Sequence, residues 1–83
     1  MREWLDAART RIAAGVAEEV AVYELTQEDV EGLLELARVA AHESGDRTNA
    51  PLVSYLVGLA HGRHPERTLR ELIEPVIGPQ GGG

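Results

Sequence analysis

Apolar residues recur every three to four positions along most of the chain, which is the spacing of one face of an α-helix. In the first segment Leu5, Ala8 and Ile12 follow this spacing, and Gly15 suits the end of a helix. The pattern predicts a helix from Arg2 to Ala14. The next segment, residues 16–25, is compatible with a continued helix or with an extended run against the core.

The second predicted helix begins after Thr26. A threonine is a good N-cap, and Asp29 stands three positions on, where its carboxylate can return a hydrogen bond to the N-cap backbone. Apolar residues keep the helical spacing from Val30 to Ala41. Gly45 follows at a position suited to a C-terminal cap, so we expect the helix to end there.

The third predicted helix opens near Thr48 or Asn49, with Pro51 in its first turn, where a missing N–H costs little. Almost every residue from there to Gly62, where we expect the helix to end, is apolar. A helix that is apolar all round is normally the central one of a bundle. Gly58 in its interior predicts that another helix crosses close by.

The fourth predicted helix starts at Pro65-Glu66, carries apolar residues from Leu69 to Val76, and ends or kinks at Pro75. Short connections between the last three helices imply antiparallel neighbours. The sequence therefore predicts an all-α fold, a compact bundle of about four short helices. It predicts one domain over residues 1–77 and a disordered, Gly-rich C-terminal tail over residues 78–83.

Composition narrows the classes of function. The chain has 83 residues, no cysteine and a formal net charge of −6. A chain with this negative charge is a poor nucleic-acid binder, because phosphate contacts supply most non-specific affinity. The longest apolar run, Ala50 to Ala60, is far short of the roughly 20 residues of a membrane span. No signal peptide fits the N-terminus, so we expect a soluble, cytoplasmic protein that binds neither nucleic acid nor membranes.

The most interesting polar group lies between the second and third helices. His42, Arg47 and Asn49 combine an imidazole, a guanidinium and an amide, and Tyr55 follows on the next helix. Together they form a candidate surface for a partner or for an anionic ligand such as a carboxylate or phosphate. The other interpretation is structural: His42 favours the helix C-terminal dipole, and the loop residues tie the loop down.

Secondary candidates lie elsewhere on the surface. Trp4 is the one large aromatic ring. Three arginines stand at helical spacing: Arg63, Arg67 and Arg70. They form either a basic stripe for an anionic partner or a salt-bridged solvent face through the i,i+4 pairs Glu66–Arg70, Arg67–Glu71 and Arg70–Glu74. His61 and His64 are three apart, but a break of the helix between them favours an exposed turn over a metal site.

The sequence lacks the common motifs of nucleotide-binding and catalytic sites. No Gly-rich phosphate loop precedes a helix, and neither Ser54 nor Thr68 has a histidine at an identifiable triad relation. We therefore expect no catalytic residue, no metal site and no cofactor. The chain is too small for a self-contained enzyme.

The order of several motifs resembles a known family. They are Trp4-Leu5, the leucine-rich run Leu33 to Arg38, Ala41-His42, Arg47, Ala50-Pro51-Leu52, Tyr55-Leu56 and Gly58-Leu59-Ala60. In this order they resemble a small actinobacterial helical domain of unknown function, found alone or fused C-terminally to a molybdenum cofactor guanylyltransferase-like domain. The resemblance implies a link to molybdopterin guanine dinucleotide biosynthesis and implies no reaction.

Two functions from different classes remain open. The first is a non-catalytic accessory or protein-interaction domain, acting on a protein partner or through self-association, with a homodimer as one form. It predicts an exposed apolar patch beside the loop 42–50 or around Trp4. The second is a small anion- or ligand-binding domain that uses His42, Arg47 and Asn49 and requires their side chains to converge.

Overall fold

The computed structural model describes residues 3–78, and in this range every regular element is helical. The elements are α1 (Glu3–Gly15), the short 3₁₀ helix η1 (Val20–Tyr23), α2 (Gln27–Ser44), α3 (Asn49–Arg63) and α4 (Leu69–Ile77). The predicted all-α fold of about four short helices is confirmed. Residues 79–83 of the predicted disordered tail lie outside the described range, whereas Gly78 closes α4 by donating its backbone N–H to Glu74.

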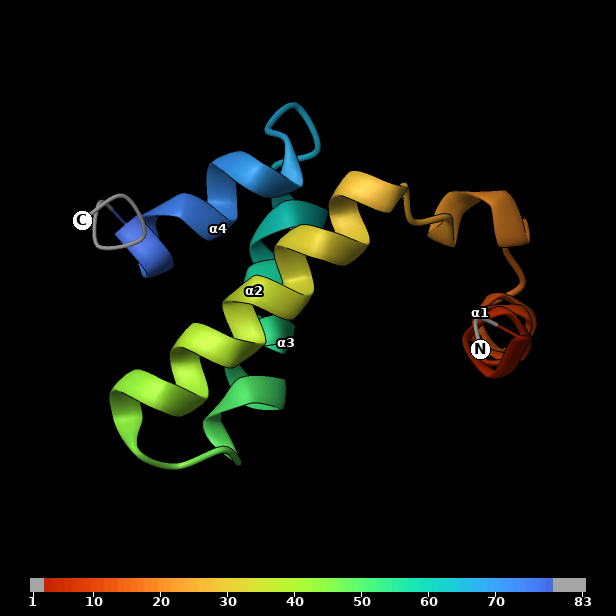
Figure 1. Cartoon of the computed structure of the whole chain (residues 1–83). Helices are drawn as coiled ribbons and strands as arrows, with labels where there is room; N and C mark the ends of the chain where they lie inside the picture. The colour runs from red at the N-terminus through yellow and green to blue at the C-terminus, as the bar shows by residue number, and fades with distance from the viewer. Residues whose placement is uncertain (1–2, 79–83) are drawn as a thin grey trace.

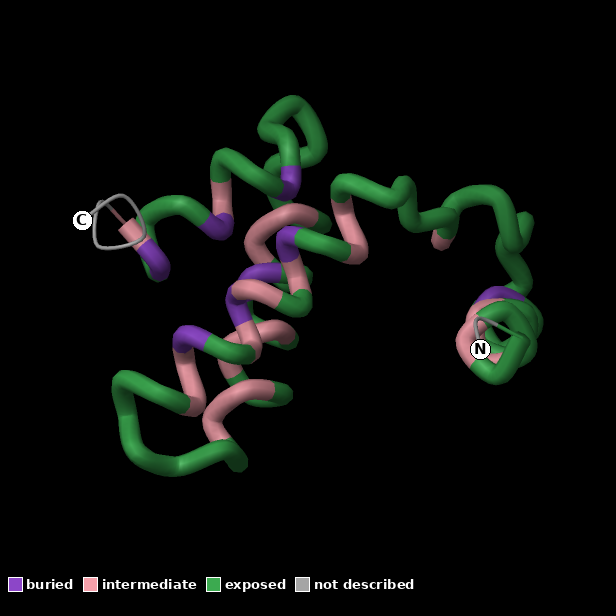
Figure 2. Tube along the Cα trace, in the orientation of Figure 1, coloured by how far each residue is buried: buried purple, intermediate pink, exposed green. Residues whose placement is uncertain are grey.

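The core lies where α2, α3 and α4 meet. α3 returns alongside α2 after a short loop, and α4 packs on both of them (Figure 1). Six aliphatic side chains form one buried cluster: Leu36, Val39, Val57, Leu69, Ile73 and Ile77. Most buried segments of the trace gather at this contact, and a further one lies on α1 at Ala13 (Figure 2). Leu36 and Ile73 are the most fully enclosed large side chains, so the α2–α4 contact is the centre of the core.

A glycine lets α2 and α4 approach each other. A Cβ atom at Gly32 would lie 3.2 Å from Cδ1 of Ile73, which is closer than side chains normally pack. The predicted close crossing at Gly58 is wrong, because a Cβ atom there would meet nothing within 4 Å. The chain therefore uses the glycine of α2, and not that of α3, to bring two helices together.

Local capping signals fix the ends of α2. The Thr26 hydroxyl accepts from the Asp29 backbone N–H at 3.0 Å, and the Asp29 carboxylate accepts from the Thr26 N–H at 3.0 Å. Gly45 takes the left-handed conformation, with φ of 73°, at the other end. Both predicted ends are confirmed, because each depends on residues within one helical turn.

The predicted start of α4 at Pro65 is wrong, since the helix begins at Leu69. A second capping box causes this: the Thr68 hydroxyl accepts from the Glu71 N–H, and the Glu71 carboxylate accepts from the Thr68 N–H at 2.9 Å. Pro75 also fails to end the helix, which continues to the buried Ile77. Burial of that last turn offsets the single hydrogen bond that proline removes.

The segment between α1 and α2 takes neither predicted form. It makes a turn through Ala17, which has a positive φ of 58°, and then the short helix η1. The Tyr23 hydroxyl donates to the Glu18 carboxylate and so ties η1 to this turn, and that hydrogen bond raises the Tyr23 pKa. Among the described elements α1 packs only against η1. Figure 1 shows α1 beyond the N-terminal end of α2.

The prediction that α3 is the central helix is wrong. Val57 is its one buried residue, and α3 continues one residue past the predicted end at Gly62. The reason is the position of α1: a four-helix packing needs a neighbour on each side of the central helix, and α1 is held away on η1. The side of α3 that faces away from α2 and α4 therefore remains exposed.

Replacing Leu36 by alanine should destabilise the domain by about 2–5 kcal/mol, because it leaves a cavity at the α2–α4 contact. Leu34 on the same helix is 60% exposed, so Leu34→Ala is a matched control with little cost. Urea unfolding followed by circular dichroism measures both. Equal midpoints for the two variants would place the core elsewhere.

Candidate functional site

The exposed side of α3 carries a continuous apolar stripe, which we call the α3 face. It consists of Leu52, Tyr55, Leu56 and Leu59, spaced i, i+3, i+4, i+7 along one side of the helix. Tyr55 is 67% exposed and Leu56 is 59% exposed. No Asp, Glu, Lys or Arg occurs between Asn49 and Gly62. This is a surface suited to another apolar helix, since it carries no charged side chain that docking would desolvate.

A hollow of about 680 Å³, which we call the η1 groove, lies beside the C-terminal half of α3. Val22, Tyr23 and Leu25 line it on the η1 side, and Gly58 and Gly62 line it on the α3 side. A Cβ atom added at either glycine would meet nothing within 4 Å, so the floor of the groove is open. The groove thus continues the apolar surface of α3 toward η1.

The η1 groove is bordered by acidic side chains. Glu18 and Glu24 flank η1, and Asp29 belongs to the first turn of α2. His61 and Pro65 border the opposite side. An apolar floor with carboxylates along one border favours an occupant that is apolar at its centre and cationic at its margin.

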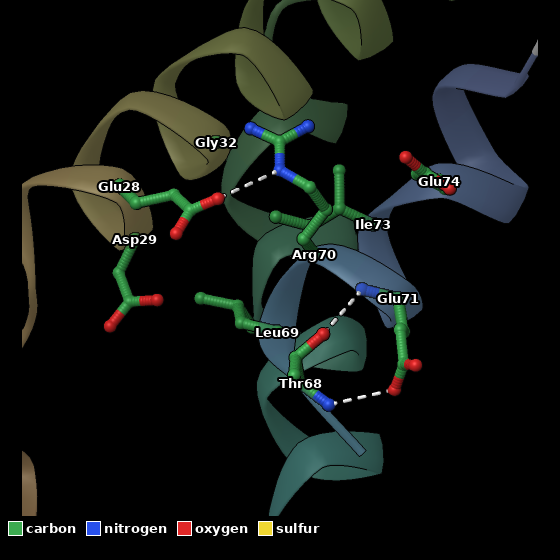
Figure 3. Close-up of a pocket in the computed structure, with 9 residues that line it drawn as sticks. All are labelled: Glu28, Asp29, Gly32, Thr68, Leu69, Arg70, Glu71, Ile73 and Glu74. Carbon is green, nitrogen blue, oxygen red and sulfur yellow. Dashed lines mark hydrogen bonds and ion pairs between the residues drawn. The ribbon is translucent and has the colours of Figure 1, made fainter.

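A second hollow, of about 320 Å³, lies where the N-terminal turns of α2 and α4 meet (Figure 3). Arg70 Nε lies 3.5 Å from the Glu28 carboxylate, so α4 is paired with α2 across this hollow (Figure 3). The carboxylate of Glu71 accepts from the Thr68 backbone N–H, which lowers its pKa. The Arg70–Glu28 pair joins α4 to α2 near Gly32, and the Glu71 contact fixes the first turn of α4, so the hollow is a structural junction.

The predicted arginine stripe is largely engaged in ion pairs. Arg67 pairs with Glu71 at 3.2 Å, as predicted. Arg70 pairs with Glu28 of α2 and with neither of its predicted partners, Glu66 and Glu74. Glu66 precedes the first turn of α4 and lies outside that helix, whereas Glu74 lies within it. Arg63 is exposed at the end of α3. Arg70 thus makes a contact between helices in place of the expected intrahelical pairs.

The candidates of the loop 42–50 lie on different elements. His42 is on the last turn of α2 and borders a shallow hollow with Arg38, Val39 and Glu43, a hollow that includes neither Arg47 nor Asn49. Arg47 is exposed in the loop, and Asn49 is the first residue of α3.

Asp46 organises this loop, a role that sequence reasoning missed. Its carboxylate accepts from the Thr48 backbone N–H at 2.9 Å and from the Thr48 hydroxyl at 2.6 Å. These two hydrogen bonds hold the Asp46 pKa below its usual value. The spacing Asp-x-Thr is the signal for such a turn, because an aspartate often bonds the backbone two residues on. A stable carboxylate at the centre of the loop disfavours an anionic ligand.

Large apolar side chains are also exposed on α1. Trp4 is 74% exposed and Ile12 is 54% exposed, which agrees with the expected apolar surface around Trp4. By helical spacing they lie on one side of α1 with Ala8 between them. The α3 face and this side of α1 are therefore both apolar and exposed.

Metal-binding groups do not assemble in the described part of the chain. Within residues 3–78 no three His, Cys, Asp or Glu side chains come together in a way that could hold a metal ion. His64 instead lies 3.6 Å from the Glu66 carboxylate in the turn before α4. The same residues include no helix with the length and apolar character needed to cross a bilayer.

Comparison with known proteins identifies a family without an assigned activity. The family described as "Domain of unknown function (DUF6457)" matches residues 1–77. No curated protein and no solved structure matches the chain. The match covers all five helical elements, so the α3 face and the η1 groove both lie within the family domain.

The lowered Asp46 pKa depends on Thr48, and Thr48→Val should raise that pKa toward its ordinary value. The shift should be partial, because the backbone N–H of residue 48 still donates. A lowered folded-state pKa stabilises the loop at pH values above the ordinary carboxyl pKa, and this contribution is lost as pH falls through the lowered value. Carboxyl-carbon NMR titration measures the shift, with Thr48→Ser as a control that keeps the hydroxyl. An unchanged pKa in Thr48→Val would assign the effect to another group.

Proposed function

For this chain, which belongs to the DUF6457 family of domains of unknown function, we propose the role of a non-catalytic protein-interaction domain. The α3 face is its docking surface, and the η1 groove extends that surface. The exposure of four large apolar side chains at helical spacing is the observation that carries this proposal. A helix packed on such a stripe would use the helix-in-groove mode of recognition.

The energy of docking supports this role. Fully burying one leucine or aromatic side chain stabilises by about 1.5–3 kcal/mol. Tyr55 and its three leucine neighbours each keep roughly half of their surface exposed or more. A partner that covers all four would gain several kcal/mol from the α3 face, enough to contribute a large share of a micromolar affinity of about −8 kcal/mol.

The distribution of charge supports a protein partner over a small anion. The chain carries a net charge of −6, and Glu18, Glu24 and Asp29 border the η1 groove. In the loop 42–50, the Asp46 carboxylate is held in its ionised form. An anion at His42 and Arg47 would approach this carboxylate, so the alternative of an anion-binding site has the weaker support.

The sequence resemblance supports a place for the domain beside an enzyme. Similar domains occur fused to molybdenum cofactor guanylyltransferase-like domains, and this chain has no Gly-rich nucleotide loop of its own. We therefore propose an accessory role in molybdopterin guanine dinucleotide biosynthesis. The domain would assemble or position its partner in the cytoplasm and leave the reaction to that partner.

A matched pair of substitutions tests the docking surface. Leu56 on α3 and Leu34 on α2 are 59% and 60% exposed, so replacing either by glutamine removes a similar amount of exposed apolar surface. With the wild-type domain as bait in extract of the native host, we expect a specific partner. Leu34→Gln should retain this partner. Leu56→Gln should weaken binding of the partner at least tenfold, as expected for a residue at the centre of an interface.

Circular dichroism on both variants checks that each remains folded. Retention of the same partner by Leu56→Gln at wild-type strength would contradict the proposal, because the α3 face would then be unused.

A further inference from the structure

We propose that the α3 face is covered by α1 of a second copy of this chain, so that two copies exchange their first helices. This inference rests on the proposed function, since it names the occupant of the same docking surface. Two helices with little packing lead to it. The α3 face lacks a partner, and α1 contacts only η1 among the described elements.

α1 needs a partner to be stable. It has 13 residues, and isolated helices shorter than about 12–15 residues are marginal in water. Its one buried residue is Ala13, whereas Trp4 remains 74% exposed. A tryptophan is the largest apolar side chain available for an interface and is among the residues most enriched in binding hot spots. The helix therefore presents its best anchor to solvent.

The two surfaces match in length and charge. Trp4 and Ile12 are about 12 Å apart along the helix axis, and Leu52 and Leu59 are about 10 Å apart, at 1.5 Å per residue. At about 100° per residue, Arg9 and Arg11 fall on opposite sides of the Trp4–Ile12 side of α1. Arg9 pairs with Asp6 at 2.8 Å and its side chain is 20% exposed, whereas Arg11 is exposed. A helix with an apolar centre and the exposed Arg11 at its margin fits a surface whose continuation, the η1 groove, has an acidic border.

The apolar area that each arrangement buries favours exchange of the first helices over direct contact between two α3 faces. The α3 face presents on the order of 300 Å² of apolar surface, well below the about 800 Å² per partner of a stable interface. In an exchange each copy contributes one α1 and one α3 face, which roughly doubles the buried area. The exchange also breaks no packing of α1 on α3 or α4, because α1 packs against neither of them (Figure 1). On the side of α2, α1 borders a small hollow of about 130 Å³ with Leu25 and the first turns of that helix.

Introduced cysteines test which surfaces meet, because the natural chain has none. Ala8 lies between Trp4 and Ile12 by helical spacing. Gly58 lies in the η1 groove at the margin of the α3 face and has open space for a side chain. Equal amounts of Ala8→Cys and Gly58→Cys should form a disulfide-linked heterodimer on mild oxidation. Ala14→Cys is the matched control: Ala14 is exposed on another side of α1, and mixed with Gly58→Cys it should cross-link far less.

The double variant Ala8→Cys/Gly58→Cys separates exchange from folding back. Exchange predicts covalent dimers. A cross-linked monomer would overturn the inference, since α1 would then cover its own α3 face.

Sedimentation separates failure of this inference from failure of the proposed function. The wild type should be a dimer, and Trp4→Ala and Leu56→Gln should each raise the dimer dissociation constant at least about tenfold, the level of an interface hot spot. A dimer weakened by Leu56→Gln and unaffected by Trp4→Ala would overturn the exchange and leave the docking surface in place. A wild type that stays monomeric at all concentrations would overturn it as well, and the extract experiment would then decide the proposed function alone.

Discussion

The structure depends on the close approach of α2 and α4 at Gly32. With only 83 residues and no cysteine, the chain has no cross-link to supplement a small core. Ile73 reaches the backbone of α2 because Gly32 has no side chain, and the buried Leu36 lies one turn further along. The Arg70–Glu28 pair closes the same junction at the surface. With α4 seated on α2, Val57 of α3 completes the core.

The small number of helices in the core determines which surfaces remain for a partner. Three helices are enough to enclose the buried cluster, so α1 is not needed there. As a result, the most apolar helix of the chain is covered on one side only. The acidic residues gather around η1 and the start of α2, while the α3 face carries no charged side chain. Two acidic copies would repel each other at most of their surfaces and least at α3, which makes this helix the natural place of contact.

Features that depend on neighbouring residues could be predicted from the sequence. Thr26, Asp29 and Gly45 fix the ends of α2 through contacts within one turn. The Thr68–Glu71 capping box is equally local, so the start of α4 at Leu69 is also encoded by neighbouring residues. The exposure of α3 could not be predicted, because a run of apolar residues has the same pattern whether its outer side meets another helix or solvent. That outcome depends on where η1 places α1, and no periodicity encodes this. For the same reason the sequence does not reveal that Gly32, and not Gly58, is the glycine of close approach.

The central claim is that α2, α3 and α4 form the stable core while α1 and the α3 face remain for docking. Hydrogen–deuterium exchange as a function of protein concentration tests it most directly, because slow exchange marks backbone amides held in stable structure. At low concentration the amides of α1 should exchange rapidly while those around Leu36 in α2 stay protected. Protection of α1 should rise with concentration, or on addition of a partner, with little change in the core. Protection of α1 equal to that of α2 at the lowest concentration would contradict the account.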